Sequence, residues 1–539
     1  MKRRTLADYR PAAVLAGLAA LSGALYFLGF AGFNQWYLAF LAYVPFAELL
    51  RRAGSGKAAF WAGWLMGLVT HLGGYYWIPG TIQQFGGFPL PLALLFDVLL
   101  CSWGGLSFGL LAWGLKRWWM AGGRPFPSLI VGVVFIEFAY PLLFPSYLAN
   151  SFWQIPVLLQ VAELGGPLLL SAVVVSVTTA LYALGRWRLG GEKFPKVALL
   201  TAGGALAATL GYGALRIGQV DADQQDAEAL RVGIVQVDMG TYQKHEEPEE
   251  GHRRHVTDSL PLQAAGVDLI VWPESSYLYP VPWQVGSDLS PHVTSRPDVA
   301  GTVNTPLLFG APRIDRSGDR PRLYNSALLL DARGQVVGST DKTYLLAFGE
   351  YLPFGETFPW IYDLSPRSGH FTPGTRLEAL PYGGYRVGAL ICYEDVLPGF
   401  TRKLVRATRP NLLVNITNDS WFGDTTEPEI HLALSVFRAV EHRRWLVRAT
   451  NSGISAVVDP VGRVVARSGQ RTRETLRATV RWQSGETVYG FAGDWLGWLS
   501  VAAVGWAFYR MWRHGHLRLR LRRAKEQRGA KVKAAKAGK

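Results

Sequence analysis

Long apolar stretches limit what this chain can fold into more than any other feature, because they occupy most of residues 12–216. A helix needs about 20 apolar residues to cross the hydrocarbon core of a bilayer. Stretches of that length predict about eight transmembrane helices, near residues 12–31, 33–50, 58–78, 89–115, 127–146, 166–185, 195–215 and 490–509. Residues 230–485 instead have the charge density of an ordinary globular protein, so we predict a folded domain outside the bilayer.

The first apolar stretch has two interpretations. Basic residues precede it, as they precede the apolar core of a secretory signal peptide. Further apolar stretches follow at once, which favours an uncleaved membrane anchor.

Basic residues in the loops predict how the chain is oriented, because Lys and Arg gather on the cytoplasmic side of a membrane. Every second loop contains them: Arg51, Arg52 and Lys57, then Lys116, Arg117 and Arg124, then Arg186, Arg188, Lys193 and Lys196. The alternate loops, residues 79–88 and 147–165, contain neither Lys nor Arg. We therefore predict a cytoplasmic amino terminus and seven crossings before residue 217.

This orientation divides the chain into four predicted parts. They are a membrane domain of seven helices (1–216), an extracytoplasmic domain (217–489), a C-terminal transmembrane helix (490–509) and a basic cytoplasmic tail (510–539). The net charge is +15, and the tail contributes 12 Lys and Arg against one acid, Glu526. Because the tail directly follows an apolar span, contact with anionic lipid head groups is a simpler interpretation than nucleic-acid binding.

Short β-branched runs alternate with helical patterns in the extracytoplasmic domain. Strands are predicted at 231–237, 267–272, 307–310, 326–330, 335–338, 387–391, 412–416 and 453–458, and helices at 252–265, 398–408 and 428–445. The alternation predicts a layered α/β domain with reactive residues in loops after strand ends. His252 and His255 flank two arginines, which indicates a solvated helix face. We predict no metal and no other cofactor.

Three predicted strands are followed by chemically complementary residues: Glu274, Lys342 and Cys392. Acyl transfer through a thiol needs a nucleophile, a base and a positive group for the oxyanion. In this interpretation Glu274 takes the thiol proton, while Lys342 stabilises the oxyanion and lowers the pKa of the thiol. Each residue alone has an ordinary alternative: a buried small side chain for Cys392, a helix cap or salt bridge for Glu274, and an exposed loop position for Lys342.

The three stretches together resemble the nitrilase superfamily, whose Glu, Lys and Cys lie on an α-β-β-α sandwich. The motifs Lys-Thr-x-Leu-x-x-Phe-Gly-Glu-Tyr-x-Pro, Cys-Tyr-Glu and Asn-Asp-Ser-Trp-Phe-Gly, together with the eight spans, are similar to those of the apolipoprotein N-acyltransferase family. The resemblance covers nearly the whole chain. It implies a polytopic α-helical membrane domain that carries an extracytoplasmic nitrilase-like sandwich.

The resemblance also implies a reaction. Cys392 takes an acyl chain from a membrane phospholipid as a thioester, and the α-amine of a lipoprotein's diacylglyceryl-cysteine then accepts it. Glu350, Tyr393 and Glu394 are implied as supporting residues. A monomer in the bacterial inner membrane is expected, with a periplasmic catalytic domain, cytoplasmic termini and no nucleic-acid partner.

Aromatic and apolar residues near the reactive stretches are candidates for a membrane-facing lid, although core packing explains any one of them equally well. The candidates are Tyr279, Trp283, Leu345, Phe348, Trp421 and Phe422.

Two other functions fit parts of the sequence. A membrane-tethered amidase would use the same three residues but release an acid to water. A transporter or binding scaffold would explain the ionisable residues Asp97 and Glu137 within predicted spans.

Overall fold

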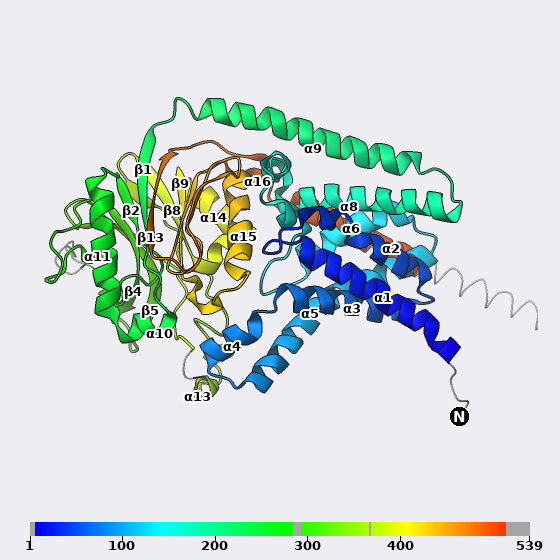
Figure 1. Ribbon diagram of the computed structural model, residues 1–539, viewed down its shortest axis with the longest axis horizontal. Helices are drawn as coiled ribbons and strands as arrows, with labels where there is room; N and C mark the ends of the chain where they lie inside the picture. Colours follow the sequence, from blue (N-terminus) through cyan, green and yellow to red (C-terminus); the bar gives the residue numbers. More distant parts are fainter. Residues whose placement is uncertain (1–5, 284–292, 366–367, 514–539) are drawn as a thin grey trace, which may run out of the picture.

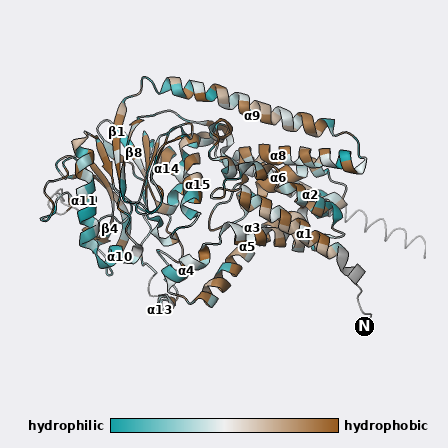
Figure 2. Cartoon of the chain, viewed as in Figure 1, coloured by the Kyte–Doolittle hydropathy of each residue, from teal (hydrophilic) through white to brown (hydrophobic). Residues whose placement is uncertain are grey.

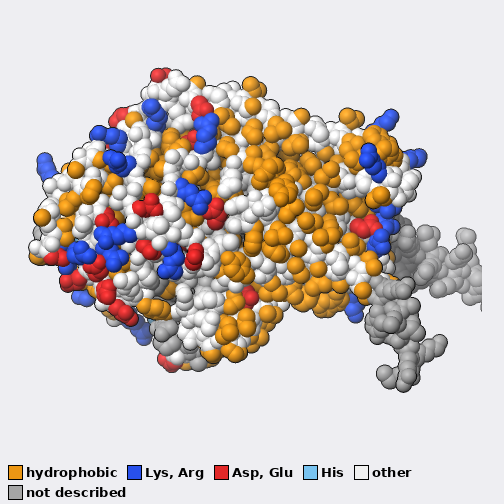
Figure 3. Space-filling view, viewed as in Figure 1, with side chains coloured by type: hydrophobic (Ala, Val, Ile, Leu, Met, Phe, Trp, Pro, Cys, Tyr) orange, Lys and Arg blue, Asp and Glu red, His pale blue; other side chains and the backbone are white. Residues whose placement is uncertain are grey.

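The computed structural model of the protein describes residues 6–283, 293–365 and 368–513, in which a helical bundle adjoins an α/β sandwich (Figure 1). Helices of the bundle are mainly hydrophobic along their length (Figure 2). Hydrophobic side chains cover much of the visible bundle surface, whereas charged side chains gather over the sandwich (Figure 3). A surface of this kind is suited to lipid around the bundle and water around the sandwich.

Within the described residues, four helices are long and apolar enough to cross a membrane. They are α1 (Leu6–Gly29), α5 (Leu90–Met120), α8 (Ala162–Gly190) and α9 (Lys196–Asp223). Helix α3 (Gly56–Gly74), helix α6 (Pro125–Ala139) and helical residues 495–513 lie at three further predicted spans. The predicted fold class, a polytopic helical domain carrying a sandwich, is confirmed, while the number of crossings stays a prediction.

The predicted span 33–50 is not one continuous α-helix. It contains a short 3-10 helix, η1 (Trp36–Phe40), and the ten-residue helix α2 (Tyr43–Arg52). Pro45 lies in the first turn of α2, where its missing N–H group costs no hydrogen bond. The same proline further inside a helix would break it, so α2 begins just before Pro45.

Glycines allow α3 and α5 to pack with their backbones close together. A Cβ atom added to Gly67 would lie 2.7 Å from the Cα atom of Gly105, and one added to Gly63 would lie 2.5 Å from the carbonyl oxygen of Phe108. Small residues at such contacts are typical of helix packing in membranes.

The sandwich contains two sheets. The first has strand order β13-β1-β2-β4-β5-β6, with β3 also paired to β4, and the second has order β12-β11-β10-β9-β8-β7. The strands of the first sheet are β1 (Ala229–Gln236), β2 (Leu269–Val271), β3 (Val281–Pro282), β4 (Leu307–Asp315), β5 (Arg322–Leu330), β6 (Val336–Asp341) and β13 (Glu474–Arg481). Those of the second are β7 (Leu380–Tyr382), β8 (Tyr385–Ile391), β9 (Leu412–Thr417), β10 (Leu446–Thr450), β11 (Ala456–Val458) and β12 (Val464–Arg467).

Helices cover both outer faces of the paired sheets, giving an α-β-β-α arrangement (Figure 1). Helix α11 (Pro248–Ala264) covers the first sheet, and α14 (Pro398–Thr408) and α15 (Glu427–His442) cover the second. Nearly all of α15 is buried, because its apolar residues join one core with those of the membrane helices. Helix α15 is therefore the layer through which the sandwich contacts the bundle.

Shorter helices connect these elements. They are α4 (Ile78–Gly86), α7 (Pro156–Leu159), α10 (Thr241–Glu246), α13 (Ile361–Leu364) and α16 (Val488–Ala492), with 3-10 helices η2 (Leu148–Phe152), η3 (Cys392–Val396) and η4 (Asp419–Phe422).

The expectation of a solvated face at His252 and His255 is wrong. Both side chains are buried and pack against Trp272, because this face of α11 covers the first sheet.

Candidate active site

Three strand ends bring charged and nucleophilic groups together. Glu274 follows β2, Lys342 follows β6 and Cys392 follows β8. The Lys342 Nζ atom lies 3.3 Å from Oε1 of Glu274 and 2.7 Å from Oε2 of Glu350. Lys342 is only 1% exposed, so both ion pairs are shielded from water. The arrangement provides a fixed positive charge beside a potential base.

Two residues that sequence reasoning missed hold this group in place. Asn325 on β5 donates from Nδ2 to Oε1 of Glu274 (2.6 Å) and to Oε1 of Glu350 (2.8 Å). Lys244 donates from Nζ to the backbone oxygen of Glu274 (2.9 Å), and burial lowers its pKa to about 7. The available signal for Asn325 was a polar residue next to the predicted apolar strand 326–330.

Cys392 begins η3 with a φ angle of +52°, in the left-handed region that a side chain with a Cβ atom rarely occupies. Its thiol is electrostatically coupled to Glu274, Lys342 and Glu350. Burial raises the pKa of the Cys392 thiol, Glu274 adds to the rise and Lys342 opposes it, leaving the pKa well above its usual value. Lys342 lowers the pKa of the thiol, as expected, but burial and Glu274 raise it by more. The sulfur of Cys392 therefore keeps its proton at rest.

Glu394 ties the loop after Lys342 to the loop containing Cys392. Its Oε1 atom accepts from the backbone N–H groups of Thr343 (2.7 Å) and Tyr344 (3.1 Å), and Oε2 accepts from that of Ile391 (2.9 Å). Burial raises the pKa of Glu394 to about 7, although the three N–H groups favour the carboxylate.

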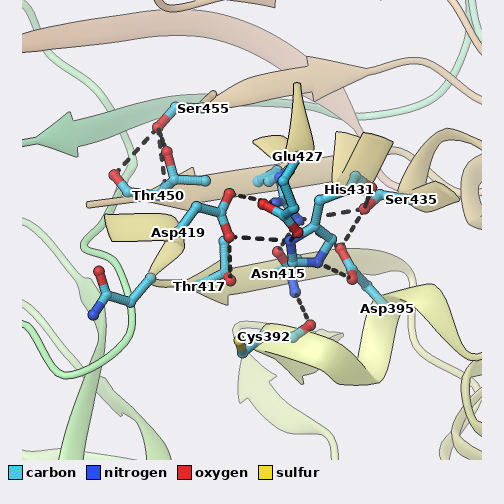
Figure 4. A network of polar contacts seen from close by, with 12 residues as sticks. Cys392, Asp395, Asn415, Thr417, Asp419, Glu427, His431, Ser435, Thr450 and Ser455 are labelled. Atoms are coloured by element: carbon cyan, nitrogen blue, oxygen red, sulfur yellow. Dashed lines mark hydrogen bonds and ion pairs between the residues drawn. The ribbon is translucent and has the colours of Figure 1, made fainter. Parts of the chain in front are cut away.

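A buried polar network contacts the Cys392 loop (Figure 4). Asn415 donates to the backbone oxygen of Cys392 (3.2 Å) and accepts from Arg448 (2.7 Å). Arg448 also pairs with Asp395 (2.8 Å) and Asp419 (2.9 Å). The chain of contacts thus connects the strained nucleophile position to ion pairs in the interior.

His431 bridges the same two carboxylates. Its Nε2 atom lies 2.9 Å from Asp395 and its Nδ1 atom 3.0 Å from Asp419. Burial works against the charged ring, but the carboxylates raise the pKa of His431 to about 10. His431 is therefore a cation at neutral pH.

Asp419, Glu427 and His431 lie close enough together to suggest a metal site. The donor set does not fit one, because each ring nitrogen of His431 already donates to a carboxylate and has no free lone pair.

A cavity of about 30 Å³ adjoins Cys392 and reaches loops that connect the helices of the bundle. Its lining includes Tyr75, Trp77 and Phe144 from the bundle and Phe422 and Glu427 from the sandwich. The supporting residue Tyr393 also lines it, and its hydroxyl donates to the carbonyl of Leu143. The reactive sulfur is therefore next to the interface with the membrane part.

The lid candidates lie in different environments. Phe422 lines the cavity and contacts Trp77, with ring centroids 5.1 Å apart. Phe348 is 62% exposed with a φ angle of +69°, and Leu345 and Trp421 are half-buried.

Among the described residues, Phe422 is the one candidate of the six that lines the cavity beside Cys392, and Tyr279 and Trp283 lie elsewhere. Trp283 packs on Tyr324 and Arg313, while Tyr279 is partly exposed beside Glu249. A lid role for the six residues stays a prediction.

Sequence comparisons match each of the two parts of the chain to a known family. Residues 231–488 match the carbon-nitrogen hydrolase family, and residues 22–180 match the apolipoprotein N-acyltransferase N-terminal domain. An apolipoprotein N-acyltransferase of Geobacter metallireducens is 31% identical over 90% of this chain and 93% of its own. That of Azotobacter vinelandii is 32% identical over 92% and 94%.

Among solved structures, an amidase from Nesterenkonia sp. is similar at 20% identity and a TM-score of 0.33, over 47% of this chain and 90% of the amidase. The two family matches and the full-length relatives agree with one another. The chain is a membrane acyltransferase with a nitrilase-like domain, and it belongs to the apolipoprotein N-acyltransferase family.

Proposed function

We propose that this acyltransferase moves a fatty acyl chain from a membrane phospholipid, through a thioester on Cys392, to the α-amino group of a lipoprotein's N-terminal diacylglyceryl-cysteine. The supporting observation is the buried Lys342 ammonium between Glu274 and Glu350, beside a thiol whose cavity is lined by loop residues of the membrane part. The names of the relatives supply the acceptor class, a lipoprotein.

In the first step, Glu274 takes the proton of Cys392 while the sulfur attacks the ester carbonyl of the phospholipid. Lys342 stabilises the negative oxygen that forms. The carbon–oxygen bond of the ester then breaks, and the departing lysophospholipid oxygen receives the proton from Glu274. The thiol of Cys392 is protonated at rest, so the reaction needs a nearby base that removes this proton.

In the second step, the neutral α-amine attacks the thioester carbonyl. Glu274 takes a proton from the attacking nitrogen and returns it to the sulfur as the carbon–sulfur bond breaks. Release of lysophospholipid before the acceptor binds makes the kinetics ping-pong. Glu350 orients Lys342. Glu394 holds the loop after Lys342 next to the loop that contains Cys392.

The predicted orientation completes this proposal. Residues 217–489 lie on the outer face of the bacterial inner membrane, spans in 1–216 and 490–509 hold them there, and the tail 510–539 is cytoplasmic. The alternation of Lys and Arg in the loops supports this orientation. The enzyme acts as a monomer.

Intact-protein mass spectrometry after incubation with phospholipid tests the proposal. We expect a mass increase of one acyl chain on Cys392 that a diacylated lipopeptide removes as it becomes triacylated. An acyl-enzyme that is discharged only by water would indicate the amidase alternative. No acyl-enzyme under conditions that support transfer to the lipopeptide would contradict the thioester.

The rate of Cys392 acylation is expected to rise with pH up to about 7 and then level off, because Glu394 loses its proton in that range. Its pKa is raised in the folded protein, so protonated Glu394 stabilises the fold at pH below 4.5, and this contribution is lost as pH rises through about 7. The carboxylate, however, is the form that accepts all three N–H groups.

Glu394→Gln cannot ionise and is the matched variant for this measurement. It should acylate more slowly at the plateau and lose the part of the pH dependence that Glu394 contributes. Identical profiles for the variant and the unmodified enzyme would exclude this role.

A further inference from the structure

One buried carboxyl near the nucleophile has no part in the steps above. Glu427, the first residue of α15, is 5% exposed, and its Oε2 atom has no hydrogen-bond partner among the described residues. Its Oε1 atom lies 3.9 Å from Nδ1 of His431. Glu427 lines the same cavity as Cys392. A buried polar atom without a partner costs free energy, so one that lines a cavity indicates a missing ligand.

The charges around Glu427 balance without it (Figure 4). Two carboxylates, Asp395 and Asp419, face two cations, His431 and Arg448. Burial, and then the charge of Asp419, raise the pKa of Glu427 well above its usual value. Glu427 is therefore protonated at rest, and a cation in the cavity would give it the partner that it lacks.

The cavity can accept a small cation although His431 also lines it, because the charge of His431 is shared by Asp395 and Asp419. Trp77 and Phe422 present aromatic rings, which attract cations, and the remaining lining is largely apolar. A space of about 30 Å³ holds a group the size of a water molecule or an ammonium. A phosphate is larger than this space.

We propose that Glu427 binds the primary ammonium group of a substrate next to Cys392. On binding, Glu427 gives its proton to solvent and forms an ion pair with the ammonium. When the acceptor supplies the ammonium, it returns one proton to Glu427, and the neutral amine then attacks the thioester. This inference rests on the proposed function, in which two substrates carry such a group. One substrate is the lipopeptide acceptor, through its α-amine. The other is a phospholipid donor, through its ethanolamine head group.

Glu427→Gln tests the proposal, because glutamine has the shape of the protonated acid but cannot form the ion pair. One arm measures acylation of Cys392 by phosphatidylethanolamine and by phosphatidylglycerol, which has no ammonium. The other arm measures discharge of the acyl-enzyme against lipopeptide concentration. Glu429→Gln is the matched control, because Glu429 pairs with Arg467 and does not line the cavity.

If the acceptor supplies the ammonium, Glu427→Gln should acylate normally from both lipids and need roughly 10- to 100-fold more lipopeptide for half-maximal discharge. If the phospholipid donor supplies the ammonium, Glu427→Gln should slow the acylation of Cys392 by phosphatidylethanolamine and leave acylation by phosphatidylglycerol unchanged. Should the glutamine variant not fold, Glu427→Asp, with a shorter reach, takes its place in both arms and should show a smaller change.

The two proposals fail in different ways. An unmodified enzyme that forms no acyl-enzyme would overturn the proposed function. An unmodified enzyme that forms it, with a Glu427 variant that matches it in both arms, would overturn the binding role and leave Glu427 with a structural one.

Discussion

Replacing Cys392 with serine is expected to abolish acyl transfer, with a rate loss of roughly 1,000-fold or more. Serine preserves the shape of the side chain, but its hydroxyl is a much weaker acid than a thiol, so Glu274 cannot take its proton as readily. The Lys342 ammonium stays in place because its partners are Glu274 and Glu350 rather than the sulfur. Mass spectrometry should show no acyl adduct, and a lipopeptide assay no triacylated product.

Cys101→Ser is the matched control for this variant. Cys101 is buried in α5 and donates to Asp97 (3.3 Å), a hydrogen bond that a serine hydroxyl can also make. We expect it to transfer acyl chains at the unmodified rate. A Cys392→Ser enzyme that transfers acyl chains without an adduct would show direct transfer between the substrates. One that forms an adduct would place the nucleophile elsewhere.

The strand-end positions of Glu274 and Cys392 could be predicted because each follows a short apolar run, whereas Lys342 follows the polar end of β6. Such a run is a buried strand whose neighbours in the sheet end at the same edge. Helix α14 was predicted with its observed bounds, since Pro398 marks its start. These features depend on local sequence, which is why sequence alone was informative.

The buried polar network that contacts the Cys392 loop could not be predicted in the same way. Three separate elements supply Arg448, His431 and Asp419. Each is of a residue type that is usually found at the protein surface. Only the tertiary structure shows that their charges are buried together. Strand β10 was missed for a related reason, because Arg448 interrupts its apolar pattern.

The structure has two short helices where one continuous span was predicted at 33–50, for a different physical reason. Hydropathy counts apolar residues but does not register where a helix can begin, and Pro45 determines that locally. Conversely, α15 looks amphipathic in sequence but is buried almost all round, because a membrane bundle covers its outer face.

Replacing Arg448 with methionine is expected to destabilise the sandwich by about 3–5 kcal/mol. Arg448 is fully buried and pairs with both Asp395 and Asp419. Methionine fills a similar volume but leaves two carboxylates facing the single cation His431, so one buried negative charge has no compensation. Chemical unfolding in detergent, followed by tryptophan fluorescence, should show a lower midpoint with little change in slope.

Two matched variants separate this effect from the general loss of an arginine. Arg467→Met removes a surface ion pair with Glu429 and should cost no more than about 1 kcal/mol. Asp419→Asn in the Arg448→Met background removes the excess negative charge and should recover part of the lost stability. Because Asn415 links Arg448 to the backbone of Cys392, we also expect the stable double variant to acylate slowly. An Arg448→Met enzyme as stable as Arg467→Met would mean that the buried charges compensate one another without Arg448.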